Sequence, residues 1–336
     1  MDGAPIPIAE FERSQKNAPR FARTSTTSIM AIAFPPIRWI VPGYVSEGLG
    51  ILAGRQKLGK TWLALDWAIA VACGGMAMGS IACDQGDVLY IDLENGQRRI
   101  QARINILFPD QRRRPDLARL EWVNDAPALN KGFLDALEDW RVSVDNPRLV
   151  IVDVLQRVKP AGNPNQNSYE SDYSALAGLQ RWATDRRVAV VALHHTRKGG
   201  ADDPLEALSG SNGLSACADT TLLLDRDQNG TTLYVRGRDV EEKESALKFV
   251  SGIWTLTGEA ADVRRSSERG NILVTLEDAE EPMSPSELAH VTGMKNGNIR
   301  RLLHAMAKAG EVQKSGRGKY VHPNNAVEKP RSADPR

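Results

Sequence analysis

Short apolar runs rich in β-branched residues alternate with segments of helical periodicity between residues 37 and 258. The apolar runs predict strands at 49–53, 87–92, 148–153, 188–194 and 220–225, and helices are predicted near 61–73, 96–107, 131–143 and 171–186. Such an alternation predicts a mainly parallel sheet covered on both faces, so the expected fold class is α/β. Two later runs, 231–238 and 247–256, predict antiparallel hairpins at the sheet edge.

The C-terminal region has a different pattern. The charged segment 264–269 is typical of a linker or of the start of a surface helix. Ser284, Pro285 and Glu287 then stand in the order of a helix cap, and a turn at 291–294 leads to a second helix over 295–309. That second helix has four core positions at helical spacing: Ile299, Leu302, Leu303 and Met306. A hairpin over 310–321 with a basic, glycine-rich tip completes the order of a small winged helix-turn-helix domain.

These patterns divide the chain into four parts. Residues 1–36 are rich in proline and predict a flexible N-terminal arm. Residues 37–258 form the expected α/β core, 259–325 the winged helix-turn-helix domain, and 326–336 a disordered tail.

Composition narrows the function classes. The chain has 336 residues and a net charge of +1, which argues against a protein that coats a polyanion along its whole surface. Its three cysteines are scattered without metal-ligand spacing, so we expect neither a disulfide framework nor a zinc site. No apolar stretch approaches the roughly 20 residues that span a bilayer, and no signal-peptide layout is present at the start. We therefore expect a cytoplasmic protein without a membrane partner.

Charge is nevertheless concentrated at one end. Residues 284–336 hold ten Lys and Arg against four Asp and Glu, a net charge of +6. This balance favours DNA binding by the winged helix. The alternative is a protein-docking module whose basic helix face is merely solvated.

One motif is far more specific than the rest. A complete G-x-x-x-x-G-K-T sequence lies between a predicted strand and a predicted helix, and it consists of Gly54, Arg55, Gln56, Lys57, Leu58, Gly59, Lys60 and Thr61. In such a loop the backbone N–H groups and the helix amino end surround phosphates. We expect Lys60 to bridge the β- and γ-phosphates and the Thr61 hydroxyl to bind Mg²⁺, so the expected cofactors are ATP and Mg²⁺.

Acidic residues end two of the other strands. Asp153 follows an apolar strand, where a carboxylate can hold the Mg²⁺ shell; the alternative is an Asp that caps a turn. No Glu is adjacent to Asp153, which is followed by Val154, Leu155 and Gln156, so the residue that activates water must come from elsewhere. Glu94 is the preferred candidate, while Asp92 competes for that role, and either residue could instead be an acid at a helix amino end.

Basic residues end two further strands. His194 and His195 are candidates for a sensor of the γ-phosphate, although a histidine at a strand end is commonly structural. Arg236 and Arg238 project to the same face of a strand and could reach the γ-phosphate of a neighbouring subunit as an arginine finger. The alternative for this pair is an exposed basic edge strand.

Together these residues resemble the RecA/DnaB-type P-loop ATPases. The resemblance is closest to the plasmid RepA-type hexameric replicative helicases and to the AAA family ATPases of phages and mobile elements. It covers roughly residues 37–258 and rests on the phosphate loop, Glu94, Asp153, the His194–His195 pair, the 210–214 segment before Asp219, and the Arg236–Arg238 pair.

The resemblance implies specific roles. Glu94 would activate water, His195 or His194 would sense the γ-phosphate, and Arg238, helped by Arg236, would act across a subunit boundary. Loops 159–172 and 197–209 would contact single-stranded DNA in a ring channel, although each could instead be a solvated loop.

The sequence thus predicts a RecA-like ring ATPase, a homo-oligomer expected to be a hexamer. It would act as a DNA helicase or translocase in the replication of a plasmid, phage or mobile element. The alternative is a DNA-binding replication regulator or helicase loader that ATP switches and that does not unwind DNA.

Overall fold

The computed structural model describes residues 23–160, 168–196, 212–227 and 230–325. The chain divides into two units, Met1–Ile37 and Arg38–Arg336. In the first unit the described residues include a short helix, α2 (Thr26–Met30), whose first turn is capped by the Ser25 hydroxyl. Most of the predicted N-terminal arm and the whole predicted tail lie outside the described residues.

A nine-stranded sheet forms the centre of the second unit, in the order β13-β12-β11-β10-β3-β9-β8-β6-β7. Six of its strands are mutually parallel: β3 (Gly48–Gly54), β6 (Asp87–Asp92), β7 (Leu120–Val123), β8 (Pro147–Asp153), β9 (Ala189–His195) and β10 (Thr220–Asp227). Three antiparallel strands extend one edge: β11 (Gly230–Gly237), β12 (Lys243–Val250) and β13 (Ile253–Glu259). The expected mainly parallel sheet with an antiparallel edge is confirmed.

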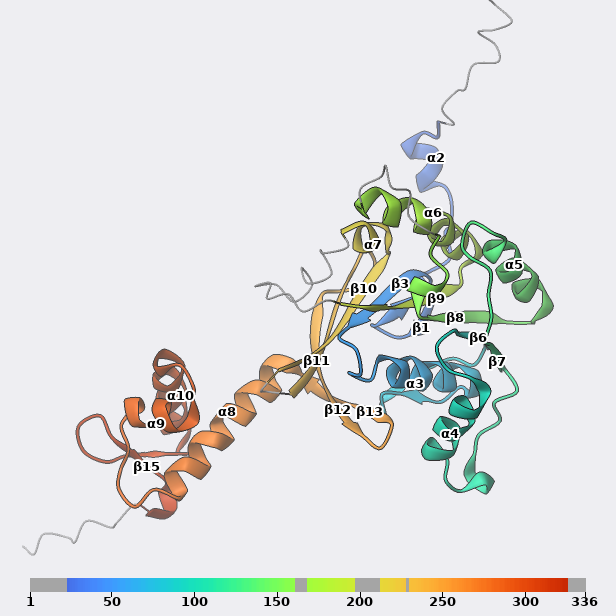
Figure 1. The fold of residues 1–336 in the computed structure, drawn as a ribbon. Helices are drawn as coiled ribbons and strands as arrows, with labels where there is room; N and C mark the ends of the chain where they lie inside the picture. Colours follow the sequence, from blue (N-terminus) through green and yellow to red (C-terminus); the bar gives the residue numbers. More distant parts are fainter. Residues whose placement is uncertain (1–22, 161–167, 197–211, 228–229, 326–336) are drawn as a thin grey trace, which may run out of the picture. The chain divides into compact units, whose positions relative to one another are not determined.

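Helices cover both faces of this sheet (Figure 1). One face carries α3 (Lys60–Cys73) and α4 (Gln97–Leu107), and the other carries α5 (Phe133–Ser143), α6 (Ser168–Arg186) and α7 (Asn212–Cys217). Because both faces are covered, the central strands β3 and β8 are almost wholly buried, which explains why their sequences are continuously apolar.

Short elements complete the second unit. Two small antiparallel pairs precede and follow α3, namely β1 (Trp39–Val41) with β2 (Val45–Ser46), and β4 (Met76–Ala77) with β5 (Ile81–Ala82). Short 3₁₀ helices lie at η1 (Gln111–Arg113), η2 (Leu155–Arg157) and η4 (Pro323–Asn325).

The C-terminal region has a hydrophobic core of its own. Helices α8 (Ala260–Glu277), α9 (Pro285–Thr292) and α10 (Asn296–Ala309) enclose it, and the strands β14 (Gln313–Lys314) and β15 (Tyr320–Val321) form the wing. The predicted capping box is present, since Ser284 and Glu287 each bond the other's backbone N–H. All four predicted core positions of α10 are buried.

The run 247–256 forms an antiparallel hairpin at the sheet edge, as predicted. It turns at Ser251 and Gly252, which both have positive φ, and so contributes to β12 and β13. The charged segment 264–269 lies in the first half of α8, so it is part of a helix, as the second of its two interpretations predicted, and not a linker. Further along the same helix, Ile272 and Leu276 enter the C-terminal core.

Candidate functional site

The loop 54–61 joins the carboxyl end of β3 to the first turn of α3, as its strand-loop-helix context predicts. Gly54 has a φ of 154°, and a Cβ at this position would lie 2.5 Å from the carbonyl oxygen of Leu224. Gly59 caps α3 with a φ of 101°, and a Cβ there would lie 2.8 Å from the indole of Trp254. The backbone conformation and these close contacts therefore require glycine at both ends of the loop.

The register of the sheet brings the other candidate residues to the same edge. Gly54 pairs with His195 on β9, and Asp92 on β6 pairs with Asp153 on β8. Since these strands are parallel, all four lie at the carboxyl edge, where open α/β sheets bind ligands.

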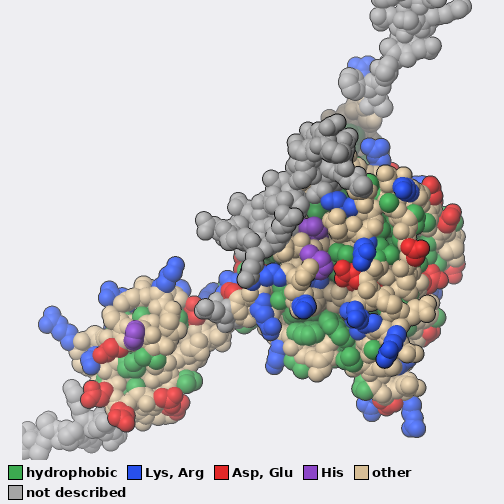
Figure 2. All heavy atoms as spheres, viewed as in Figure 1, with side chains coloured by type: hydrophobic (Ala, Val, Ile, Leu, Met, Phe, Trp, Pro, Cys, Tyr) green, Lys and Arg blue, Asp and Glu red, His purple; other side chains and the backbone are tan. Residues whose placement is uncertain are grey.

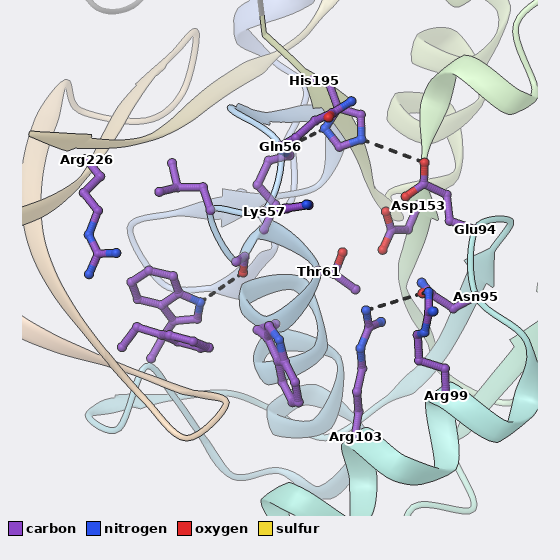
Figure 3. Close-up of a pocket in the computed structure, with 16 residues that line it drawn as sticks. Gln56, Lys57, Thr61, Glu94, Asn95, Arg99, Arg103, Asp153, His195 and Arg226 are labelled. Atoms are coloured by element: carbon purple, nitrogen blue, oxygen red, sulfur yellow. Dashed lines mark hydrogen bonds and ion pairs between the residues drawn. The ribbon is translucent and has the colours of Figure 1, made fainter.

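A cavity of about 710 Å³ opens at this edge (Figure 3). Nine of the predicted site residues line it: Gln56, Lys57, Leu58, Gly59, Lys60, Thr61, Glu94, Asp153 and His195. The first two residues of the loop, Gly54 and Arg55, do not line the cavity. Arg55 is exposed, and its Nε lies 3.8 Å from the carboxylate of Asp225.

Lys60 lies at the base of the cavity and is only 4% exposed. Its Nζ donates to the carbonyl oxygens of Gly54 and Arg55, at 2.6 and 2.9 Å, and lies 3.0 Å from Nδ1 of His195. Burial lowers the pKa of Lys60 to about 8, although Asp153 and Glu94 oppose this shift. The Lys60 ammonium is therefore held in a fixed position. A bound anion beside it would compensate the cost of burying its charge.

Asp153 and Thr61 lie side by side, and the Thr61 hydroxyl bonds the Asp153 carboxylate. Asp153 is 2% exposed and also accepts from the Tyr90 hydroxyl at 3.2 Å. Burial, helped by Asp92, raises the pKa of Asp153 to about 6. A hydroxyl and a carboxylate fit Mg²⁺, which prefers oxygen ligands and takes only one or two from the protein at phosphate sites. The described residues include no cluster of three or more His, Cys, Asp or Glu side chains that could hold a metal ion.

Glu94 and Asp92 differ in how far their side chains are buried. The Asp92 side chain is fully buried, and it accepts hydrogen bonds from the backbone N–H groups of Glu94 and Asn95. The Glu94 side chain is 41% exposed and lines the cavity. Of the two carboxylates, only Glu94 can face a water molecule in the cavity.

The two histidines are separated by strand alternation. His195 lines the cavity, with Nε2 at 3.9 Å from Oε1 of Glu94 (Figure 3). Its neighbour His194 is half-buried, points to the other face of β9 and does not line the cavity. Burial and the Lys60 charge lower the pKa of His195, so that its imidazole is neutral beside the ammonium.

Arg236 and Arg238 lie away from this cavity. They stand at the end of β11, which pairs with the start of β10 and so lies at the amino edge of the parallel strands. Arg236 pairs with Glu242 at 2.6 Å, and Arg238 pairs with Asp219 at 3.0 Å. Both line a separate cavity of about 310 Å³. Within one chain, therefore, they do not contact the phosphate loop.

Sequence reasoning missed one wall of the cavity. Trp62, Phe249 and Trp254 line it, and the rings of Phe249 and Trp254 are tilted with centroids 4.7 Å apart. The indole N–H of Trp254 donates to the carbonyl oxygen of Gly59 at 3.1 Å. Phe249 and Trp254 come from the β12–β13 hairpin, which only the folded topology brings beside α3.

Sequence analysis also missed four polar residues that line the cavity: Asn95, Arg99, Arg103 and Arg226.

Comparison with known proteins identifies the family. A family model described as AAA domain matches residues 15–201, which is more than half of the chain. The chain belongs to the AAA domain family. The family is one of phosphate-loop proteins, which bind nucleotides and typically use Mg²⁺.

A second family model, described as IclR helix-turn-helix domain, matches residues 270–316. These residues cover the second half of α8, then α9, α10 and the start of the wing. The predicted fold class is thereby confirmed as an α/β core with a mainly parallel sheet and a small C-terminal helix-turn-helix domain.

Two solved structures resemble the chain. The first, described as an ATPase domain, is 18% identical with a TM-score of 0.49, and the match covers 62% of this chain and 84% of that one. The second, titled "The Structure Of A DnaB-Like Replicative Helicase And Its Interactions With Primase", is also 18% identical with a TM-score of 0.49. That match covers 63% of this chain and 58% of the other, so the chain spans less than two thirds of the second relative.

Two predicted DNA-contacting loops are not described in full. Loop 197–209 lies outside the described residues, as do residues 161–167 of loop 159–172, and α6 begins at Ser168. In the described part of the chain, no helix combines the length and the apolar character that crossing a bilayer requires.

Proposed function

We propose that this AAA domain protein hydrolyses ATP with Mg²⁺ and acts as a ring-shaped DNA helicase or translocase. The ring would be a hexamer of identical chains, working in the replication of a plasmid, phage or mobile element, as in RepA-type helicases. One observation carries the proposal: Lys60, Thr61, Glu94, Asp153 and His195, which come from four parts of the chain, converge on one cavity.

Each of these residues has a chemical role in the proposal. Lys60 would exchange its bonds to loop carbonyls for the β- and γ-phosphates. Thr61 and Asp153 would hold Mg²⁺, which neutralises phosphate charge when it is bound. Glu94 would accept the proton of the attacking water, and His195 would contact the γ-phosphate and respond to its loss.

The aromatic wall would accept the nucleobase. The phosphate loop fixes one end of the ligand, and Phe249 and Trp254 line the same cavity beside that loop. Stacking of a base on aromatic rings contributes about 1–3 kcal/mol in nucleic-acid complexes, and the same physics applies here.

Arg236 and Arg238 would complete the neighbouring subunit's site. Their place at the amino edge, away from their own phosphate loop, favours a role across a subunit boundary over one within the chain. Each would have to leave its present carboxylate partner, Glu242 or Asp219, to reach a phosphate.

DNA would be bound in two places. Single-stranded DNA would lie in the ring channel against loops 159–172 and 197–209. Duplex DNA would be bound by the helix-turn-helix domain, where exposed basic residues stand out from the surface (Figure 2). On α10 these are Arg300, Arg301, His304 and Lys308, and on the wing they are Lys314, Arg317 and Lys319.

The proposal is tested by ATPase rates with and without single-stranded DNA and by strand displacement on a forked duplex. Lys60→Ala and Arg238→Ala chains, each inactive alone, are also co-expressed to form mixed rings. An intact Arg238 on a Lys60→Ala chain then lies beside the intact cavity of an Arg238→Ala chain, so partial recovery of activity is expected. Arg238→Ala chains that remain active as isolated monomers would contradict the ring.

A second function is favoured by the basic helix-turn-helix domain. The protein could be a replication regulator or helicase loader that binds duplex DNA and uses ATP only to switch its assembly. Specific duplex binding through residues 284–322, without strand separation or DNA-stimulated turnover, would identify this function.

A further inference from the structure

A buried polar network surrounds the turn that carries Glu94. Glu94 lies between the end of β6 and the start of α4, and Asn95 follows it with only 8% exposure. We propose that Asn95 is a positioning residue, which fixes this turn so that the Glu94 carboxylate faces the cavity. This inference rests on the proposed role of Glu94 in hydrolysis.

The amide of Asn95 uses both of its ends. Its Nδ2 donates to both carboxylate oxygens of Asp92, at 2.9 and 3.1 Å, and its backbone N–H donates to Asp92 Oδ1 at 2.8 Å. Its Oδ1 accepts from Arg99 at 2.8 Å and lies 3.5 Å from Arg103 Nη2. An amide side chain can donate to a carboxylate through its NH₂ group and accept from guanidinium groups through its oxygen at the same time.

The network also holds the backbone of Glu94. Asp92 Oδ1 accepts from the N–H of Glu94 at 3.2 Å, so the carboxylate that Asn95 orients also fixes the Glu94 backbone. Asn124, which follows β7, closes the turn from the other side by donating to the carbonyl oxygens of Asp92 and Asn95, at 3.1 and 3.0 Å. These contacts leave the Glu94 side chain as the solvent-facing carboxylate of the turn.

The same network reaches the phosphate loop. Arg103 lies 3.9 Å from Asp92 Oδ2, and its guanidinium carbon lies 5.5 Å from the centre of the Trp62 ring. Trp62 directly follows Thr61 on α3. The distance between Glu94 and the residues around the phosphates is thus set by packed and hydrogen-bonded groups.

The inference predicts a loss of rate without a loss of binding. A catalytic group displaced by about 1 Å can cost about 100-fold in rate. We therefore expect Asn95→Ala to slow single-turnover ATP hydrolysis by about 10- to 100-fold. The affinity for ATP should change less than about three-fold, because Asn95 does not hold the phosphate loop.

A double-mutant cycle separates positioning from general damage. Hydrolysis and ATP affinity are measured on the full chain for wild type, Asn95→Ala, Glu94→Gln and the double variant. If Asn95 acts through Glu94, adding Asn95→Ala to Glu94→Gln causes no further slowing. Asn105→Ala is the matched control, because Asn105 also lies on α4 and accepts from an arginine, Arg114, outside the cavity. It should hydrolyse ATP at the wild-type rate.

Several results would overturn the inference. It fails if the two substitutions slow hydrolysis multiplicatively, or if Asn95→Ala weakens ATP binding as much as it slows hydrolysis. Should Asn95→Ala not fold, Asn124→Ala tests the same turn from β7 and must show the same non-additivity. If Glu94→Gln hydrolyses ATP slowly and Asn95→Ala hydrolyses it at the wild-type rate, only the positioning role of Asn95 is contradicted. A Glu94→Gln protein with the wild-type rate removes the proposed function as well.

Discussion

Nδ1 of His195 lies 3.0 Å from the ammonium nitrogen of Lys60, and Nε2 of the same ring lies 3.9 Å from the carboxylate of Glu94. A lysine ammonium can only donate, so Nδ1 must accept and the ring proton must be on Nε2. The imidazole therefore connects the group proposed to hold the phosphates with the group proposed to activate water.

This arrangement predicts how His195 titrates. Burial and Lys60 lower its pKa below the ordinary 6.5, while Glu94 opposes the shift. As the pH falls from about 6.5 toward the lower folded-state value, the unfolded chain takes up a proton first, so stability should fall over this window. Histidine NMR should show a proton on Nε2 and a pKa below 6.5. The free energy of unfolding of His195→Gln, measured with urea between about pH 5 and 8, should lack the part of the pH dependence that His195 causes. A pKa of His195 above 6.5 would contradict the geometry.

The aromatic wall predicts a loss of nucleotide affinity without a loss of rate. Phe249→Ala removes a ring of the cavity whose partner, Trp254, remains fixed by its bond to Gly59. We expect ATP and ADP to bind more weakly by at least about 1 kcal/mol, roughly five-fold, because both carry the same base. Equilibrium binding measures the affinity, and turnover at saturating ATP should remain unchanged. Val250→Ala, at an exposed neighbour outside the cavity, is the control. A change in kcat alone would argue against a base site at this wall.

The helix-turn-helix domain predicts a contribution to DNA binding that is separate from hydrolysis. Arg300 and Arg301 are exposed on α10. Replacing either with Ala should weaken duplex binding and reduce the slope of log affinity against log salt by about one, as expected for loss of a phosphate contact. Basal ATPase activity should not change. Arg265→Ala on α8, an exposed arginine paired with Asp262, is the control. Unchanged duplex affinity in both α10 variants would favour a docking role for this domain.

The fold was largely predictable because its strands are buried on both faces. Strands β3, β8 and β9 have continuous apolar runs at their centres, and their positions were predicted within one residue. Strand β7 was missed because only Leu120 in it is buried, which leaves little apolar signal. The hairpin over 247–256 was predicted, whereas the position of its turn, at Ser251 and Gly252, was not.

Site residues at the ends of strands could be predicted from the sequence. Site residues that come from distant parts of the sheet could not. Asp153, Glu94 and the histidine pair stand at or just after the ends of predicted strands, so a parallel sheet had to bring them to one edge. Which of His194 and His195 faces the cavity depends on the register of β9, which the sequence did not fix. Phe249 and Trp254 come from the antiparallel edge, and no local signal relates them to a loop nearly two hundred residues earlier. Asn95 had a local signal in its position after Asp92 and Glu94, because Asp readily bonds backbone N–H groups two and three residues ahead.

The most direct test of the central claim compares ATP binding with ATP turnover in Glu94→Gln. The amide keeps the size of the side chain and removes its ability to accept a proton. We predict that the variant binds ATP and Mg²⁺ with nearly wild-type affinity, while hydrolysis slows by about 100-fold or more. If Glu94→Gln hydrolyses ATP at the wild-type rate, the cavity at the carboxyl edge of the sheet does not carry out the proposed chemistry.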